Sequence, residues 1–100
     1  SSAEIKSRVS AARDIQLKRY NNDGIFFNSQ LTSSQTEKYC VMDNDASELI
    51  KAAFDSLRLS ARAYHKILKV ARTIADLEGS SKIRLEHAAE ALQYRNLSLP

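Results

Sequence analysis

Apolar residues recur along most of this chain at intervals of three and four positions, the spacing of an amphipathic α-helix. The first such segment predicts a helix over 3–20, opened by the capping-box sequence Ser1-Ser2-Ala3-Glu4. Its expected inward face carries Ile5, Val9, Ala12 and Gln16. The run Asn21-Asn22-Asp23-Gly24 then favours a turn, so the first helix should end at about residue 20.

The same periodicity predicts four further helices. A short one runs from Ser34, which starts a second possible capping box, to about Cys40. The next covers 45–58 with Asp45 as its N-cap, and another begins after Ser60 and ends at Gly79. The last covers 83–95, with Leu85, Ala88, Ala89 and Leu92 facing inward.

The composition agrees with a helical fold. The chain has two glycines and one proline, which favours helices over a turn-rich β architecture. No low-complexity stretch or linker divides its 100 residues, so we expect one domain. The predicted fold class is all-α: a single bundle of four main helices plus a short one, over residues 1–95, with a frayed tail at 96–100.

The net charge of +3 is unevenly distributed. The first 20 residues carry five basic and two acidic groups, residues 21–59 carry three and six, and residues 60–100 carry seven and four. Two basic ends on one face would attract a polyanion or nucleotide phosphates. The basic ends could equally pair with the acidic middle, and the charges alone leave both arrangements open.

Several kinds of chemistry have no motif here. There is no G-x-x-x-x-G-K-[ST] phosphate loop, no H-E-x-x-H and no Cys/His cluster at zinc spacing, since His65 and His87 fall on different predicted helices. We therefore expect no metal site and no self-contained enzyme. A single cysteine, Cys40, suits a reducing compartment, and the absence of a signal peptide or an 18-residue apolar run favours a cytoplasmic protein without membrane contact. The start at Ser1 suggests a piece of a longer protein.

Two stretches are more specific than composition. Residues 60–79, SARAYHKILKVARTIADLEG, and residues 85–95, LEHAAEALQYR, closely resemble the C-terminal region of the magnesium-chelatase-like AAA+ ATPases, the competence-protein ComM/YifB group. Residues 8–20, RVSAARDIQLKRY, resemble that family's R-V-x-x-A-R-x-x-Q-x-x-R pattern, and Asn28-Ser29-Gln30-Leu31 resembles its N-A-x-L element. The departures are small: Ser29 replaces the usual Ala, and Lys66 the usual Arg.

The resemblance implies a function. In this family the region is the helical lid after an AAA+ core, so the Walker motifs would lie upstream and the full-length protein would be an ATPase using ATP and Mg²⁺. The isolated chain is expected to bind neither. Arg62 looks like the sensor-2 arginine, which approaches the γ-phosphate. The partners implied are the upstream core, a homo-oligomeric ring, expected to be a hexamer, and DNA in recombination or competence.

Six other basic residues are candidate phosphate or subunit contacts: Lys66, Lys69, Arg72, Arg8, Arg13 and Arg19. The first three follow Arg62 and His65 along one predicted helix, where a solvated face is the simpler interpretation, and Arg72 could also pair with Asp76. The three arginines of the first helix could face the core or be exposed. Gln16, on the inward side, is expected to hydrogen-bond a loop around Asn28 because a buried glutamine needs partners.

Two other functions remain open. The first is a free-standing basic nucleic-acid-binding module, which the sequence pI of about 9.2 supports and the acidic middle opposes. The second is a protein–protein adaptor bundle, which predicts an exposed apolar patch. The sequence does not determine the DNA substrate, any link to metal chelation, or whether Arg62 acts within its own subunit.

Overall fold

The computed structural model describes residues 1–21 and 23–98, with side chains described as far as Tyr94. The helices are α1 (Ser2–Arg19), the 3₁₀ turn η1 (Asn28–Gln30), α2 (Ser33–Tyr39), α3 (Asn44–Ser56), α4 (Ala61–Leu77) and α5 (Leu85–Ser98). No strand forms among the described residues. The all-α prediction of four main helices and a short one is confirmed. No helix in the described ranges is long and apolar enough to span a membrane.

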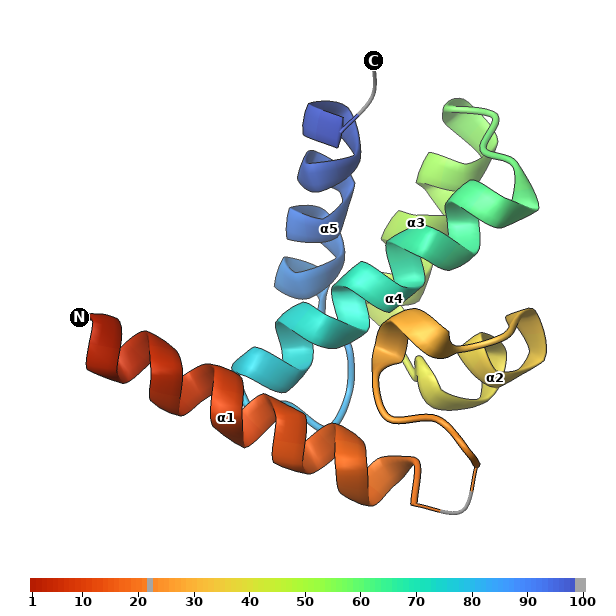
Figure 1. The fold of residues 1–100 in the computed structure, drawn as a ribbon. Helices are drawn as coiled ribbons and strands as arrows, with labels where there is room; N and C mark the ends of the chain where they lie inside the picture. Colours follow the sequence, from red (N-terminus) through yellow and green to blue (C-terminus); the bar gives the residue numbers. More distant parts are fainter. Residues whose placement is uncertain (22, 99–100) are drawn as a thin grey trace.

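α4 is the central element of the fold (Figure 1). It contacts α1, η1, α2 and α5, while α3 packs mainly against α5. Its buried side combines apolar Ile67, Leu68, Ala71 and Ala75 with two charged residues. A helix that contacts so many others must bury a wide stripe, and here the last two turns of that stripe bury the charged Arg72 and Asp76 beside Ala71 and Ala75.

Both ends of α4 are capped as the sequence predicts. Ser60 Oγ accepts a hydrogen bond from Ala63 N at 3.1 Å. At the other end Gly79 takes φ +72°, and the amides of Gly79 and Ser80 donate to the carbonyls of Asp76 and Ala75, at 3.0 and 2.9 Å. This is a Schellman motif, which satisfies the last carbonyls of the helix.

α1 differs from its prediction. The Ser1–Glu4 capping box is present, but Ile5 is 61% and Val9 37% exposed, and only Ala12 and Gln16 of the expected face are buried. Figure 1 shows the reason: the N-terminal half of α1 extends beyond the other helices. Helical spacing identifies an apolar face, but burial requires a partner at that height of the helix.

The starts of three helices, α2, α3 and α5, differ from the predicted positions. α2 is capped by Thr32, paired with Gln35, in place of the expected Ser34. α3 is capped by Asp43, whose carboxylate accepts from Ala46 N at 2.8 Å, so Asp45 lies in the first turn.

α5 begins after Ile83, because Ile83 pairs with the segment before α3. Its amide donates to Val41 O at 2.8 Å, and its carbonyl accepts from Asp43 N at 3.0 Å. Of the residues expected to face inward on α5, Ala88 is buried, but Leu85 is exposed. The helical backbone continues to Ser98, past the expected end at 95, and the rest of the expected frayed tail, 99–100, lies outside the described residues.

Candidate functional site

A buried polar cluster joins α1, η1 and α4. Asp76, with no exposed side-chain surface, accepts two hydrogen bonds from the Arg19 guanidinium, at 2.6 and 2.9 Å. It also accepts from Arg72 Nε at 3.2 Å and from Asn28 Nδ2 at 2.9 Å. One carboxylate therefore receives donors from three elements, and we refer to Arg19, Asn28, Arg72 and Asp76 as the Asp76 cluster.

Arg72 is 1% exposed, which makes the prediction of a solvated face for it wrong. Its guanidinium donates to Asp76 and to the carbonyls of Ser80 and Ser81, at 2.7 and 3.0 Å. The anticipated pairing of Arg72 with Asp76 is present. With these donors satisfied inside the domain, Arg72 connects α4 to the loop that follows it and does not reach an external phosphate or subunit.

Arg19 is also part of the fold, with 16% of its side chain exposed. Burial acts to lower its pKa, but hydrogen bonds with Asp76 and Tyr20 outweigh that effect and raise the pKa above the usual arginine value. For Arg72 burial lowers the pKa, and Asp76 offsets only part of the effect. Of the candidate contacts on α1, Arg19 is thus occupied within the domain.

The predicted contact between Gln16 and the loop at Asn28 is confirmed. Gln16 Oε1 accepts from Asn28 N at 3.1 Å, and both residues are buried. Asn28 Oδ1 accepts from Arg19 Nη1 at 3.3 Å and from the hydroxyl of Tyr20. Residues of the two N-terminal motifs, Gln16, Arg19 and Asn28, therefore serve the fold by connecting α1 to η1.

The helical spacing in the sequence could have indicated this cluster, although the basic residues along the same helix suggested a solvated face instead. Leu68, Arg72 and Asp76 recur at four-residue intervals beside the buried row of Ile67, Ala71 and Ala75. Charged residues at such positions on an apolar helix face are expected to pair inside the domain.

Arg62 lies apart from the Asp76 cluster, in the first turn of α4. It is exposed, no acidic residue shares that turn, and no described side chain pairs with it. Lys66 is exposed and Lys69 is partly exposed on the same helix, also without an acidic partner among the described side chains. On α1, Arg13 is exposed and Arg8 is exposed with a long hydrogen bond, 3.5 Å, to Leu77 O.

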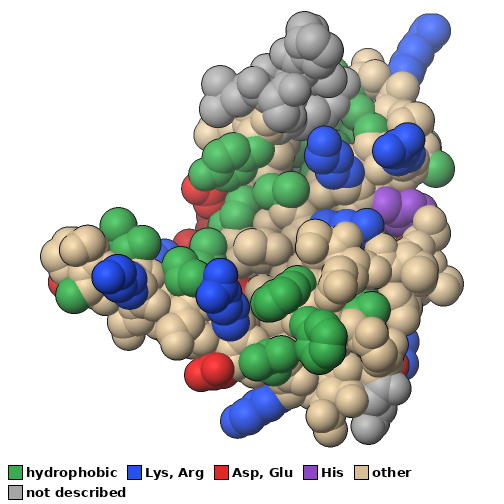
Figure 2. All heavy atoms as spheres, viewed as in Figure 1, with side chains coloured by type: hydrophobic (Ala, Val, Ile, Leu, Met, Phe, Trp, Pro, Cys, Tyr) green, Lys and Arg blue, Asp and Glu red, His purple; other side chains and the backbone are tan. Residues whose placement is uncertain are grey.

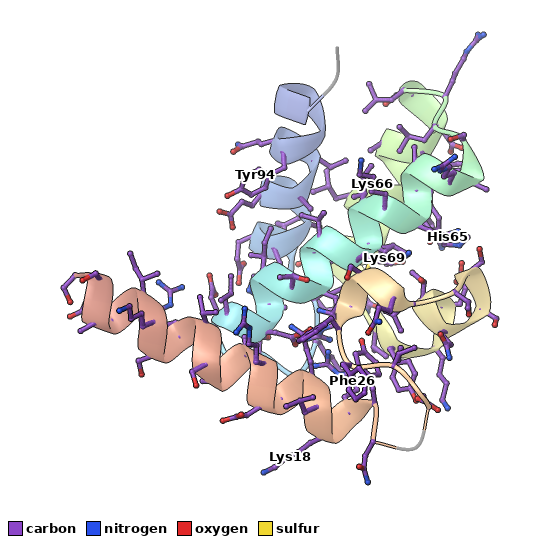
Figure 3. The ribbon with its side chains drawn as sticks, viewed as in Figure 1. Lys18, Phe26, His65, Lys66, Lys69 and Tyr94 are labelled. Atoms are coloured by element: carbon purple, nitrogen blue, oxygen red, sulfur yellow. The ribbon has the colours of Figure 1, made fainter. Side chains whose placement is uncertain are left out.

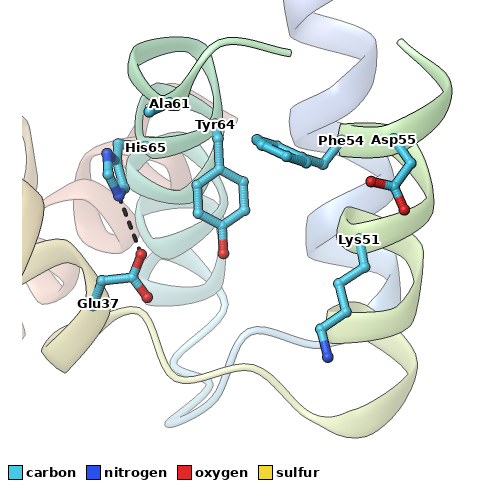
Figure 4. Close-up of a pocket in the computed structure, with 7 residues that line it drawn as sticks. All are labelled: Glu37, Lys51, Phe54, Asp55, Ala61, Tyr64 and His65. Carbon is cyan, nitrogen blue, oxygen red and sulfur yellow. Dashed lines mark hydrogen bonds and ion pairs between the residues drawn. The ribbon is translucent and has the colours of Figure 1, made fainter. Parts of the chain in front are cut away.

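An open cleft of about 510 Å³ lies next to the start of α4, between α2, α3 and α4. Figure 4 shows Tyr64 and Phe54 in an edge-to-face arrangement, with ring centroids 5.4 Å apart, and His65 bonded to Glu37 at 3.1 Å. Its other lining residues are Lys51, Asp55 and Ala61. Arg62 follows Ala61, which lines the cleft, but Arg62 itself does not line it.

Glu78, Glu86 and His87 place their ligand atoms within 4.8 Å of one another, which raises the question of a metal. His87 Nδ1 accepts from Arg84 N at 2.9 Å, so in the neutral ring Nε2 carries the proton and donates to Glu78 at 3.0 Å. Neither nitrogen has a free lone pair for a metal. His87 instead caps α5 and ties it to the end of α4.

Cys40, the sole cysteine, is buried at the end of α2. Burial raises the pKa of its thiol to about 11. Because the thiolate is the reactive form, Cys40 serves as a small core residue.

Comparison with known proteins agrees with the resemblance in the sequence. Residues 1–95 match the family model described as magnesium chelatase, subunit ChlI C-terminal. The chain is 42% identical over 94 residues to competence protein ComM of Haemophilus influenzae, and 40% identical over 95 residues to YifB of Salmonella typhimurium and of Escherichia coli.

These alignments cover 94–95% of the chain but only 18% of each relative. The matched region is thus one part of larger proteins. With a family model covering residues 1–95 and relatives of this similarity, the chain belongs to the magnesium chelatase ChlI C-terminal family, in its ComM/YifB group.

Proposed function

We propose that the chain is the helical lid of an AAA+ ATPase, closing over ATP and Mg²⁺ bound by a core domain elsewhere in the full-length protein. The observation that carries this proposal is the exposed Arg62 guanidinium in the first turn of α4, which has no acidic partner among the described side chains. The positive end of a helix dipole usually attracts an acidic side chain, and here it carries an arginine. Such a site suits an anion supplied from outside the domain.

The chemistry of Arg62 fits a phosphate. A guanidinium offers donors in a planar fork that matches phosphate oxygens, and the helix N-terminus adds to the attraction. ATP in the core would supply the phosphoryl group, and Arg62 would stabilise the negative charge that accumulates on its oxygens. Because α4 is capped at both ends and tied to α1 by the Asp76 cluster, movement of Arg62 would move the whole domain.

The proposal extends to the assembly. A relative carries the name competence protein, and we propose that the full-length protein acts on DNA in recombination or competence as a cytoplasmic ring, a hexamer. Lid movement would then couple hydrolysis to rotation between neighbouring subunits. Lys66, Lys69, Arg8 and Arg13 stay exposed or partly exposed and are available for contacts with the core, a neighbouring subunit or DNA.

The test is ATP turnover by the full-length protein carrying Arg62→Ala. We expect kcat to fall tenfold or more, a barrier increase of at least about 1.4 kcal/mol. Arg62→Lys should recover part of the rate, because it restores the charge without the fork.

The matched control is Lys82→Ala, which removes an exposed cation from the loop between α4 and α5. Circular dichroism establishes that each variant keeps its helices. Unchanged turnover with Arg62→Ala would reject the lid role of this residue.

A further inference from the structure

Two neighbouring phenylalanines are presented to solvent between α1 and η1. Phe26 is 57% and Phe27 43% exposed, and their ring centroids lie 6.5 Å apart with the planes inclined by 58°. Neither ring packs against the core, whereas the preceding residue, Ile25, does so in part. A pair of exposed aromatic rings is an apolar surface that points to a binding role.

Hydrogen bonds to glutamine side chains fix the backbone that carries these rings. Gln30 Oε1 accepts from both Phe26 N and Phe27 N, at 2.7 and 3.0 Å. The next amide, Asn28 N, donates to Gln16, and Asn28 Nδ2 donates to Thr73 Oγ1 at 3.0 Å. The loop is thus tied to α1 and α4, and the rings are held out in a preorganised arrangement.

Three lysines lie on the same side of the molecule as the rings, one on α1 and two on α4. In Figure 3, Lys66, Lys69, Phe26 and Lys18 follow one another from the top to the bottom of the view, and in Figure 2 the hydrophobic side chains of this region have blue side chains above and below them and a red one at the lower left. Thr73 Oγ1 donates to Lys69 O while it accepts from Asn28, so the turn of α4 that carries Lys69 adjoins the loop. None of the three lysines has an acidic partner among the described side chains.

We propose that this Phe26 face, made of Phe26, Phe27, Lys18, Lys66 and Lys69, binds single-stranded nucleic acid. Bases stack on the two phenylalanine rings, and phosphates of the stacked and neighbouring nucleotides contact the lysine ammonium groups. An acidic peptide would satisfy the lysines, but it has no general need for two adjacent flat rings. Duplex DNA keeps its bases stacked and leaves the rings unused.

The inference rests on the DNA-directed part of the proposed function and deepens it by naming the surface. Binding at the Phe26 face requires neither bound ATP nor Arg62. The Phe26 face can therefore be tested on the 100-residue chain alone, and its outcome is separate from that of the ATP turnover experiment.

The experiment is fluorescence anisotropy with a labelled oligothymidylate of about 20 nucleotides, titrated with the chain at several salt concentrations. Three phosphate contacts predict a slope of log K against log[salt] of about −2. Phe26→Ala should weaken binding about tenfold and leave the slope unchanged, because the ring carries no charge. Lys69→Ala should make the slope shallower by about 0.7.

Two control variants match these changes. Leu57→Ala removes an exposed apolar side chain at the far end of α3, and Lys51→Ala removes an exposed cation from α3. Both should bind like the unaltered chain. All four variants alter exposed or partly exposed side chains, so their helices should survive, as circular dichroism can verify.

Three results would overturn the proposal. They are no saturable binding by about 100 μM chain, equal affinity of Phe26→Ala and the unaltered chain, or tighter binding to duplex than to single strand. Concentration-dependent self-association that Phe26→Ala abolishes, in a chain that binds no oligonucleotide, would assign the face to protein contact instead. If Arg62→Ala keeps ATP turnover while the Phe26 face binds, only the lid role fails.

Discussion

Arg19 and Asp76 are 57 positions apart in the sequence, yet they form a two-point ion pair with N–O distances of 2.6 and 2.9 Å. The pair fastens the last turn of α1 to the last turn of α4. Two guanidiniums share this one carboxylate, because Arg72 contacts it as well. One buried acid therefore holds the end of α1 to α4, in addition to the bond between Gln16 and Asn28 that joins α1 to η1.

Asp76→Asn should destabilise the domain strongly. It keeps the side-chain volume but leaves Arg19 and Arg72 without their counter-charge. Breaking a buried ion pair in this way costs about 3–5 kcal/mol of unfolding free energy. Urea denaturation measures the loss. Asp55→Asn, at an exposed acid of α3, is the control and should change stability by less than about 0.5 kcal/mol. Similar effects of the two changes would show that the Asp76 cluster contributes little.

The N-cap of α3 offers a second matched pair. Asp43→Ala removes the carboxylate that accepts from Ala46 N, and should cost about 1 kcal/mol. Asp45→Ala removes only a first-turn charge and should cost about half as much or less. Thermal unfolding of both variants compares the two positions directly. A larger effect at Asp45 would contradict the observed start of α3.

Cys40 should make the domain sensitive to alkaline pH. The folded thiol has a pKa of about 11 against an ordinary value of 9.0, so between those values only the unfolded state loses its proton. Ionisation then favours unfolding, and stability that is complete below pH 9 falls as pH rises to 11, by up to about 2–3 kcal/mol.

Cys40→Ala removes this contribution. Urea unfolding at pH 8 and about 10.5 should show a smaller loss for the variant than for the unaltered chain. Burial also raises the pKa of Tyr20 and Tyr64, but both proteins contain these residues, so the difference between them reports Cys40. Equal losses in the two proteins would mean that the thiol is not desolvated.

Zn²⁺ should not stabilise the domain, despite the proximity of Glu78, Glu86 and His87. Coordination would require His87 to give up either its bond from Arg84 N or the proton it donates to Glu78. Adding about 100 μM Zn²⁺ should therefore leave Tm unchanged, whereas specific binding at micromolar Kd would raise it by mass action. A rise in Tm that His87→Gln abolishes would establish a metal site.

Much of the architecture was predictable from local sequence. Periodicity indicated every main helix, Ser60 and Gly79 marked the ends of α4, and a buried Gln16 implied a partner near Asn28. Caps were less predictable, since Thr32 and Asp43 had equally suitable neighbours in Ser34 and Asp45. Capping energies of about 1 kcal/mol are small enough for tertiary contacts to choose between adjacent positions.

The residues of the candidate site were likewise predictable only in part. Arg62 could be singled out from the resemblance and its place at a helix start. The fate of Arg72 could not be assigned, because helical spacing alone placed it with His65 as readily as with Leu68.

The sequence by itself determined the helices, their apolar faces and the family, because these depend on residues close together in the chain or on an extended motif. The tertiary structure decided which cations are buried and which are free. Arg19 and Arg72 are neutralised by Asp76, whereas no such acid lies beside Arg62, Lys66 or Lys69 among the described side chains. That distinction depends on charges from distant segments meeting in a medium of low dielectric constant, where the cost of an unpaired ion enforces the pairing.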